Sequence, residues 1–216
     1  AYIVFGHSGP WPAKIYLSEL NVSTGVIIFG ATAGDNFGIS VSCAGDFNGD
    51  GIDDVIVGAQ NADPNSKTDA GMAYIIFGRK NWPTTIEMTS FSNSDGIKLN
   101  GESAGSACGT SVSSAGDVNH DGVADVIIGA PKYLTSTGRI YVVFGQEGVN
   151  IWTSPVELGS LNGTNGFLLT GASGDYAGTT VGGGGDYNKD GISDVLVGGI
   201  GWSSNKGRSC LVFGSY

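Results

Sequence analysis

The sequence predicts an all-β protein assembled from the blades of a β-propeller. Two markers recur along its 216 residues with a period of about 70 residues. One is a nine-residue loop of the form D-x-N-x-D-G-x-x-D, and the other is an apolar segment that ends in Phe-Gly. Between the markers lie short stretches whose apolar residues alternate as in strands, with no convincing helical period. Four short antiparallel strands in each repeat make up a propeller blade.

The expected strands follow the same order in every repeat. The first strand leads into the loop, over residues 37–45, 108–116 and 177–185. The second strand leaves the loop, over residues 54–59, 125–130 and 194–199. The third is the Phe-Gly segment, which ends at Gly6, Gly78, Gly145 and Gly214. A connection that contains a Trp then leads to the fourth strand, which starts near Gly25, Gly96 and Gly166.

These positions divide the chain into one incomplete blade and three repeats. We expect an N-terminal strand pair over 1–36, full repeats over 37–107 and 108–176, and a repeat over 177–216 without its fourth strand. Three repeats do not close a ring, because propellers usually hold four to eight blades. The chain is therefore expected to be part of a larger propeller, to form six blades with a second chain, or to complete a neighbouring chain head to tail. The last arrangement would build a ring or an open filament by strand addition. Because an unpaired strand edge promotes association, further blades or self-association are expected.

The nine-residue loops have the composition of calcium sites. Positions 1, 3, 5 and 9 are Asp, Asn, Asp and Asp in all three copies, and position 7 adds a backbone carbonyl. The glycine at position 6 permits the positive φ that a tight curl needs. Hard oxygen ligands without Cys or His are typical of Ca²⁺. Position 12 is Val or Ile and not the Glu of an EF-hand, and the flanks alternate like strands, which excludes that motif. A simple turn would not require four such side chains in every copy.

The stretch FGISVSCAGDFNGDGIDDVIVGAQ closely resembles the FG-GAP repeat of integrin α subunits and of many bacterial surface proteins. Its FG becomes Cys-Gly at 108–109 and Ala-Gly at 177–178. Its GAP appears as Gly-Ala-Gln at 58–60, Gly-Ala-Pro at 129–131 and Gly-Gly-Ile at 198–200, so the third repeat is the most divergent outside its loop. The resemblance implies that the loop between the first two strands of a blade binds Ca²⁺, at three sites. The implied ligands are Asp46, Asn48, Asp50, Ile52 (carbonyl) and Asp54; Asp117, Asn119, Asp121, Val123 (carbonyl) and Asp125; Asp186, Asn188, Asp190, Ile192 (carbonyl) and Asp194.

The net charge of the chain limits the classes of partner that it is expected to bind. Its formal net charge is −10, which disfavours nucleic acids and anionic membranes. Nine of its 20 acidic residues are the predicted ligand aspartates of the three loops, and three bound Ca²⁺ would leave a net charge of about −4. No apolar run is long enough for membrane insertion. The three cysteines, Cys43, Cys108 and Cys210, fall at unrelated repeat positions and are expected to be small buried hydrophobes and not a disulfide framework.

The sequence offers no catalytic constellation, so we expect a protein that is not an enzyme. No G-x-S-x-G nucleophile elbow occurs, and metal ligation accounts for the regular carboxylates. Trp11, Trp82 and Trp152 recur in the connections, where packing between blades is favoured over an exposed platform for a sugar or protein. Asn21 and Asn162 open N-x-S/T sequons, which makes them candidate glycosylation sites of a secreted protein.

These features predict a secreted or cell-surface protein that uses Ca²⁺ to stabilise a structural or adhesive propeller. One alternative is an integrin-like module that recognises a peptide or glycan ligand. The other is a non-catalytic propeller attached to a hydrolase.

Overall fold

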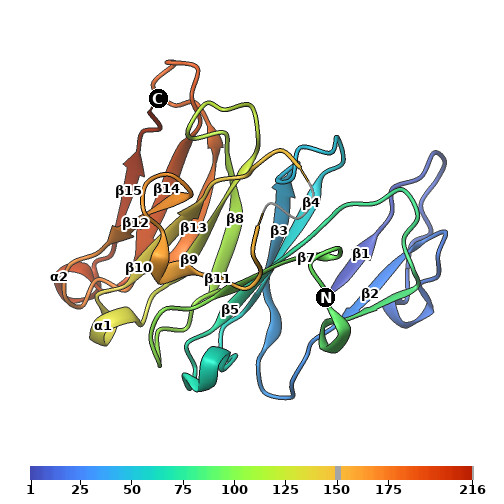
Figure 1. Ribbon diagram of the computed structural model, residues 1–216, viewed down its shortest axis with the longest axis horizontal. Coiled ribbons are helices and arrows are strands. Elements are labelled where there is room, and N and C mark those ends of the chain that lie inside the picture. Colours follow the sequence, from blue (N-terminus) through green and yellow to red (C-terminus); the bar gives the residue numbers. More distant parts are fainter. Residues whose placement is uncertain (149–151, 216) are drawn as a thin grey trace.

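The structure is a computed structural model that describes residues 1–148 and 152–215, and its sheets follow one another from the N-terminal to the C-terminal end of the chain (Figure 1). It confirms the all-β prediction, with four sheets formed mainly by antiparallel pairs. The first sheet contains β1 (Tyr2–Val4), β2 (Gly25–Phe29) and β6 (Thr85–Glu87). The second, in spatial order, contains β11 (Val156–Glu157), β7 (Gly96–Asn100), β5 (Met72–Ile76), β4 (Asp54–Ala59) and β3 (Phe37–Gly45).

The third and fourth sheets repeat this order. The third sheet runs from β12 (Gly166–Thr170) through β10 (Arg139–Val143) and β9 (Asp125–Ala130) to β8 (Ser111–Gly116). The fourth contains β13 (Ala177–Gly185), β14 (Asp194–Gly199) and β15 (Arg208–Val212). The helical elements are single short turns: η1 (Leu17–Glu19), η2 (Pro64–Ser66), η3 (Met88–Ser90), α1 (Tyr133–Ser136), η4 (Leu158–Ser160) and α2 (Trp202–Asn205).

Apolar residues on both faces of the inner sheets explain why the sheets stack. In β9 the side chains of Val126 and Ile128 join the core that faces the second sheet, whereas Ile127 joins the core that faces the fourth. All three are fully buried. A strand covered on both faces reads as a continuous apolar run, because successive side chains point to opposite faces. Each pair of neighbouring sheets therefore shares one core.

Two short strands differ from the prediction of four antiparallel strands per repeat. β6 pairs in parallel with β2 of the preceding sheet, and β11 pairs in parallel with β7 of its preceding sheet. Both strands lie in the Trp-containing connections. A further difference concerns β8, which begins at Ser111 and not at Cys108, the residue that forms an isolated bridge with Gly71. The connections thus tie each sheet to the sheet before it.

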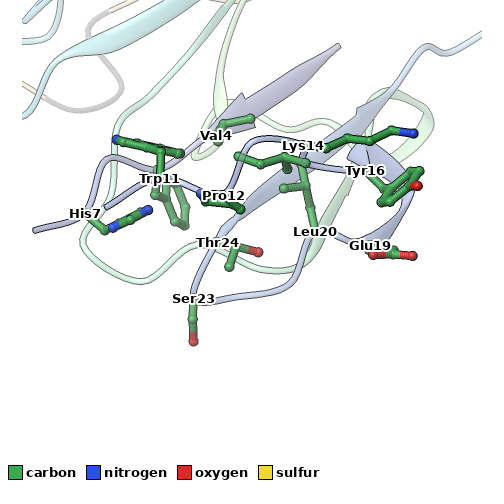
Figure 2. A pocket seen from close by; sticks show the side chains of 12 residues that line it. Val4, His7, Trp11, Pro12, Lys14, Tyr16, Glu19, Leu20, Ser23 and Thr24 are labelled. Carbon is green, nitrogen blue, oxygen red and sulfur yellow. The ribbon is translucent and has the colours of Figure 1, made fainter. Parts of the chain in front are cut away.

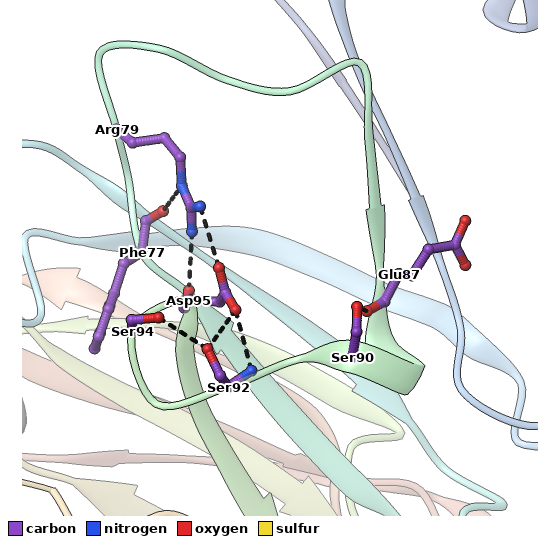
Figure 3. Close-up of polar contacts among 7 residues, drawn as sticks. All are labelled: Phe77, Arg79, Glu87, Ser90, Ser92, Ser94 and Asp95. Carbon is purple, nitrogen blue, oxygen red and sulfur yellow. Dashed lines mark hydrogen bonds and ion pairs between the residues drawn. The ribbon is translucent and has the colours of Figure 1, made fainter.

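Side-chain hydrogen bonds hold the second Trp-containing connection (residues 79–95) in place (Figure 3). The Arg79 guanidinium donates hydrogen bonds to the Phe77 carbonyl and to the Asp95 carboxylate, both at 3.3 Å. Asp95 also accepts from the amide of Ser92 at 3.1 Å and from its hydroxyl at 2.7 Å. The hydroxyl of Ser90 donates to the carbonyl of Glu87, at the end of β6. These bonds fix both ends of the connection.

Tryptophan and cysteine burial agree only in part with expectation. Trp82 and Trp152 are partly buried against the cores, and Trp152 stacks on Phe47 with ring centroids 5.9 Å apart. Trp11 is 51% exposed, which differs from the expected packing between blades. All three cysteines are free, but only Cys108 is buried. Cys43 in β3 and Cys210 in β15 are exposed, because most residues of these two strands are exposed or half-buried, so the expectation of burial was wrong for these two residues.

Candidate metal centre

Each nine-residue loop is a tight bend between the first two strands of a sheet. The loops join β3 to β4, β8 to β9, and β13 to β14. The glycines at position 6 have φ of 84° at Gly51, 90° at Gly122 and 89° at Gly191, as the predicted curl requires. Position 4 is also left-handed in every loop, although it is occupied by Gly49, His120 or Lys189. The flanking strands confirm that this is not an EF-hand.

In the first loop, the oxygens of positions 1 and 3 converge on one point. Asp46 Oδ1 and Asn48 Oδ1 both accept a hydrogen bond from the amide of Asp50, at 2.9 and 3.0 Å. Asp46 Oδ2 accepts from the amide of Gly51 at 2.8 Å. The carboxylate of position 5 joins them, because Asn48 Nδ2 donates to Asp50 Oδ2 at 3.1 Å. Three of the predicted ligand side chains thus lie together.

The other two loops reproduce these contacts. The amide of Asp121 donates to Asp117 Oδ1 at 3.0 Å and to Asn119 Oδ1 at 3.2 Å. The amide of Asp190 donates to the matching oxygens of Asp186 and Asn188, each at 3.1 Å. Three loops with different residues at positions 2, 4 and 8 therefore adopt one arrangement, which the Asp, Asn and Gly positions dictate.

The aspartate at position 9 has a structural role that the sequence reasoning missed. Asp54 is fully buried and accepts from the amides of Phe47 and Gly78, at 3.0 and 2.7 Å. Gly78 is the glycine of the Phe-Gly marker, and a Cβ there would lie 2.3 Å from the carbonyl oxygen of Asp53. The loop and the Phe-Gly marker are therefore one unit. Their shared period was the signal that links them.

Position 9 makes the same pair of bonds in the other loops. Asp125 accepts from Val118 at 2.8 Å and from Gly145 at 2.9 Å. Asp194 accepts from the amides of Tyr187 and Gly214, at 2.7 and 3.1 Å.

The residue at position 7 of each loop packs against the glycine of the Phe-Gly marker. Its amide donates to the position 5 carboxylate at 2.9 Å in every loop. Its side chain also approaches the glycine of the Phe-Gly marker: atoms of Ile52, Val123 and Ile192 lie within 2.7 Å of the place that a Cβ on that glycine would occupy.

The buried carboxylates carry an electrostatic cost. Burial, and to a smaller extent the neighbouring loop carboxylates, raise the pKa of Asp54 to about 6 and that of Asp125 to about 7, although the amide hydrogen bonds lower both. Among the described residues, no group of three carboxylate, imidazole or thiol side chains is arranged as a metal cluster. The chemistry of the donor set at positions 1, 3 and 5 nevertheless fits a hard cation, and the oxygens of positions 1 and 3 already converge. The position 9 carboxylate is held by amides.

The loops also contact one another across the sheets. The amide of Ala124, in the second loop, donates to the carbonyl of Asp46 in the first loop at 3.3 Å. The amide of Ser193, in the third loop, donates to the carbonyl of Asp117 at 3.0 Å. The amide of Gly148 reaches the carbonyl of Asn48 at 2.8 Å. The order of one loop is thereby coupled to the order of the next.

Comparison with known proteins agrees with these repeated loops. The sequence profile of the FG-GAP repeat family matches residues 37–76 and 109–143. The chain contains FG-GAP repeats. It is 31% identical to integrin alpha-2 of Bos taurus over 199 residues, and this alignment covers 88% of the chain and 16% of the integrin. It is 30% identical to integrin alpha-6 of Gallus gallus over 175 residues, with 81% of the chain and 14% of the integrin covered.

A further relative is integrin alpha-PS5 of Drosophila melanogaster, 33% identical over 121 residues, with 56% of the chain and 11% of the integrin covered. The chain therefore spans less than a fifth of the length of these relatives. Both FG-GAP matches contain the loop and the strands on either side of it. Among the described residues, no helix is long and apolar enough to cross a membrane. The sequon residues Asn21 and Asn162 are exposed, each in a turn before a fourth strand.

Proposed function

We propose that this chain is an extracellular calcium-binding module, non-catalytic, whose FG-GAP blades have a structural or adhesive role. The observation that carries the proposal is the threefold repetition of one arrangement, in which the position 1 and position 3 oxygens meet at the amide of position 5. Side chains of one chemistry placed identically three times are best explained by one ligand. Oxygen donors of this kind select Ca²⁺ among common metals.

The residues that would hold the cation are those of positions 1, 3 and 5, with the carbonyl of position 7 and the carboxylate of position 9 completing the proposed set. A bound divalent cation would supply positive charge between carboxylates that otherwise repel one another. The chain's own contribution is to keep the loop bent, through the position 6 glycine, and to anchor it through the position 9 aspartate. Binding energy would then appear as folding stability.

Calorimetric titration with CaCl₂ tests the proposal. We expect three ions per chain with dissociation constants on the order of 10⁻⁴ to 10⁻³ M, the range of extracellular modules. Asp121→Asn, which keeps the shape of the side chain, is expected to reduce the number of bound ions by one. Lys132→Gln, an exposed change outside the loops, is the matched control. Absence of heat with Ca²⁺, together with an unchanged melting temperature in EDTA, would contradict the proposal.

The similarity to integrin α subunits favours a second candidate, in which the propeller recognises a protein or glycan ligand. Exposed Trp11 and Tyr16 offer aromatic contact area of the kind that binding surfaces use. Binding of the chain to a peptide or glycan array, lost in Trp11→Ala, would support recognition over a purely structural role.

A further inference from the structure

The first nine-residue loop is contacted along its backbone by the third Trp-containing connection, which joins β10 to β12. The amide of Gln146 donates to the carbonyl of Phe47 at 3.1 Å, and the amide of Gly148 donates to the carbonyl of Asn48 at 2.8 Å. These two carbonyls belong to positions 2 and 3 of the loop. The repeat over 108–176 thus holds the backbone of the loop that belongs to the preceding repeat.

The two backbones approach each other closely at position 4 of the loop. Gly49 has a φ of 69°, and a Cβ on it would lie 3.0 Å from the Cα of Glu147, closer than side chains normally pack. The start of this contact is repeated at the second loop, where the amide of Ser215 donates to the carbonyl of Val118 at 3.3 Å. The chain that follows a Phe-Gly marker therefore runs along the loop of the sheet before it.

An aromatic contact adds to these hydrogen bonds. Phe47 is fully buried and stands in the sequence between two predicted ligands, Asp46 and Asn48. Its ring stacks on that of Trp152, with centroids 5.9 Å apart and 28° between the planes. The buried indole nitrogen of Trp152 has no hydrogen-bond partner among the described residues. Packing against Phe47 and the surrounding core therefore holds the indole ring in place.

The rest of the connection is anchored to the second sheet, independently of the loop. Val156 of β11 lies opposite Leu99 of β7 in a parallel pair. Glu157 Oε1 accepts hydrogen bonds from the side-chain amides of Asn65 and Asn100, at 2.8 and 2.7 Å. The tryptophan is thus carried by a segment that is itself fixed to the sheet whose loop it contacts.

The tryptophans of the other two connections have different surroundings. Trp11 lies beside His7, with ring centroids 4.2 Å apart, and borders an open cavity of about 310 Å³ (Figure 2). Trp82 packs against the core between the first and second sheets, and its ring centroid is 5.4 Å from the guanidinium carbon of Arg79. These contacts do not involve a nine-residue loop. Trp82 therefore provides a matched control for Trp152.

We propose that Trp152 is a positioning residue for the first calcium loop, and that the connection carrying it sets the calcium affinity of this loop. The connection holds Phe47 and the two loop carbonyls, and so keeps Asp46 and Asn48 in the bend that brings their oxygens together. A site that is already ordered binds more tightly, because less conformational freedom is lost on binding. The inference rests on the proposed calcium function and adds that one repeat controls the site of the repeat before it.

Calorimetric titration with CaCl₂ tests this role in a chain that carries Asp121→Asn and Asp190→Asn and so keeps only the first site. Trp152→Ala is expected to raise the dissociation constant of that site at least about fivefold. Trp152→Phe retains a ring that can stack and is expected to restore most of the affinity. Trp82→Ala is expected to leave the dissociation constant within about twofold of the parent value, because it does not contact the loop.

A second parent chain distinguishes positioning from general loss of stability. Asp50→Asn with Asp190→Asn keeps only the second site, whose Val118 packs in the core between the third and fourth sheets, whereas Trp152 packs in the core between the second and third. Trp152→Ala is expected to leave this site unchanged. An unchanged first site, or equal losses at both sites, would overturn the positioning role. Absence of calcium binding in both parent chains would overturn the proposed function itself, and this inference with it.

Fluorescence of the native tryptophan gives a measurement that does not depend on the folding of Trp152→Ala. Replacing the other three tryptophans, Trp11, Trp82 and Trp202, by Phe leaves Trp152 as the single emitter. Because coupling between binding at the loop and packing of the connection is reciprocal, its emission is expected to change with CaCl₂ at the midpoint of the first site. Asp50→Asn is expected to abolish this change, and Asp190→Asn to leave it intact. Emission that ignores CaCl₂ while calorimetry shows the first site filled would contradict the coupling.

Discussion

Two aspartates of one loop serve different purposes. Asp121 is exposed and lies beside Asn119, with 2.8 Å between Asn119 Nδ2 and Asp121 Oδ2. Asp125 is fully buried and accepts hydrogen bonds from two backbone amides, that of Val118 in the same loop and that of Gly145 after β10. A motif of four oxygen-bearing residues therefore combines an exposed carboxylate, one of the ligands of the proposed calcium site, with a buried carboxylate that anchors the loop. Mutation can test the two carboxylates separately.

Asp125→Ala is expected to destabilise the chain whether or not calcium is present. The substitution leaves the buried amides of Val118 and Gly145 without acceptors, and each unpaired amide is expected to lower the free energy of unfolding by about 1–3 kcal/mol. Asp121→Asn is expected to change stability by less than about 0.5 kcal/mol in EDTA, because it is an exposed isosteric change, and to weaken stabilisation by calcium. Urea denaturation with and without EDTA measures both. An Asp125→Ala chain as stable as wild type in EDTA would refute the anchor.

The Asp95 carboxylate gives a pH dependence of known sign. Desolvation acts to raise its pKa, but hydrogen bonds from Ser92 and the Arg79 guanidinium outweigh this and lower the pKa below its ordinary value. The stabilisation is therefore fully present above the unfolded-state pKa of 3.8 and is lost as the pH falls through the lower, folded-state value.

The comparison of wild type with Asp95→Asn isolates that contribution. We expect wild type to be more stable by on the order of 1 kcal/mol near neutral pH, with the difference disappearing in acid. Arg79→Gln is expected to shrink the difference, because it removes one of the groups that lower the pKa. Chemical denaturation at several pH values measures this difference in the free energy of unfolding. A difference that grows as the pH falls would contradict the assigned sign.

At the scale of elements, the sequence predicted those strands that are long enough to show an alternating apolar pattern. β4, β9 and β14 have the bounds expected from the alternation after each loop, because the position 9 aspartate fixes where each strand begins. β6 and β11 were missed because they have three and two residues, too few for a periodic signal. A neighbouring sheet, and not local propensity, makes them strands.

For the candidate site, too, the sequence predicted the local geometry but not the contacts between strands. The convergence of positions 1, 3 and 5 follows from loop spacing and the glycine at position 6 alone. The pairing of Asp54 with Gly78 was not predictable in this way, because it joins residues of two different strands. Contacts of this kind depend on how the sheet closes.

Equivalent leucines in two connections are expected to differ in their contribution to stability. Leu158 is fully buried between sheets, and Leu158→Ala is expected to cost about 3–5 kcal/mol. Leu17 holds the matching position in the first connection (residues 7–24) and is 43% exposed, so Leu17→Ala is expected to cost less than about 1 kcal/mol. Chemical denaturation measures both variants. Equal losses would show that the first connection is packed after all.

At the scale of the whole molecule, charge is concentrated where the loops are. The net charge is −10, and ten of the 20 acidic residues belong to the three loops, namely the nine predicted ligand aspartates and Asp53. The loops of neighbouring sheets touch through backbone hydrogen bonds, such as that between Ala124 and Asp46, so their charges also lie close to one another. Self-repulsion of this kind destabilises a compact state and is reduced by screening or by bound cations.

Salt is therefore expected to stabilise the calcium-free chain more than the calcium-bound chain. In EDTA, raising NaCl from about 0.05 M to about 0.5 M shortens the screening length and should raise the melting temperature by about 2–4 °C for each kcal/mol of repulsion removed. With saturating Ca²⁺ the net charge falls to about −4, and the rise should be smaller. The chain with Asp46→Asn, Asp117→Asn and Asp186→Asn is the control, because it lowers the repulsion and impairs all three sites. Its melting temperature should respond weakly to salt in either buffer. A wild-type salt response of equal size with and without Ca²⁺ would show that the repulsion arises elsewhere on the chain.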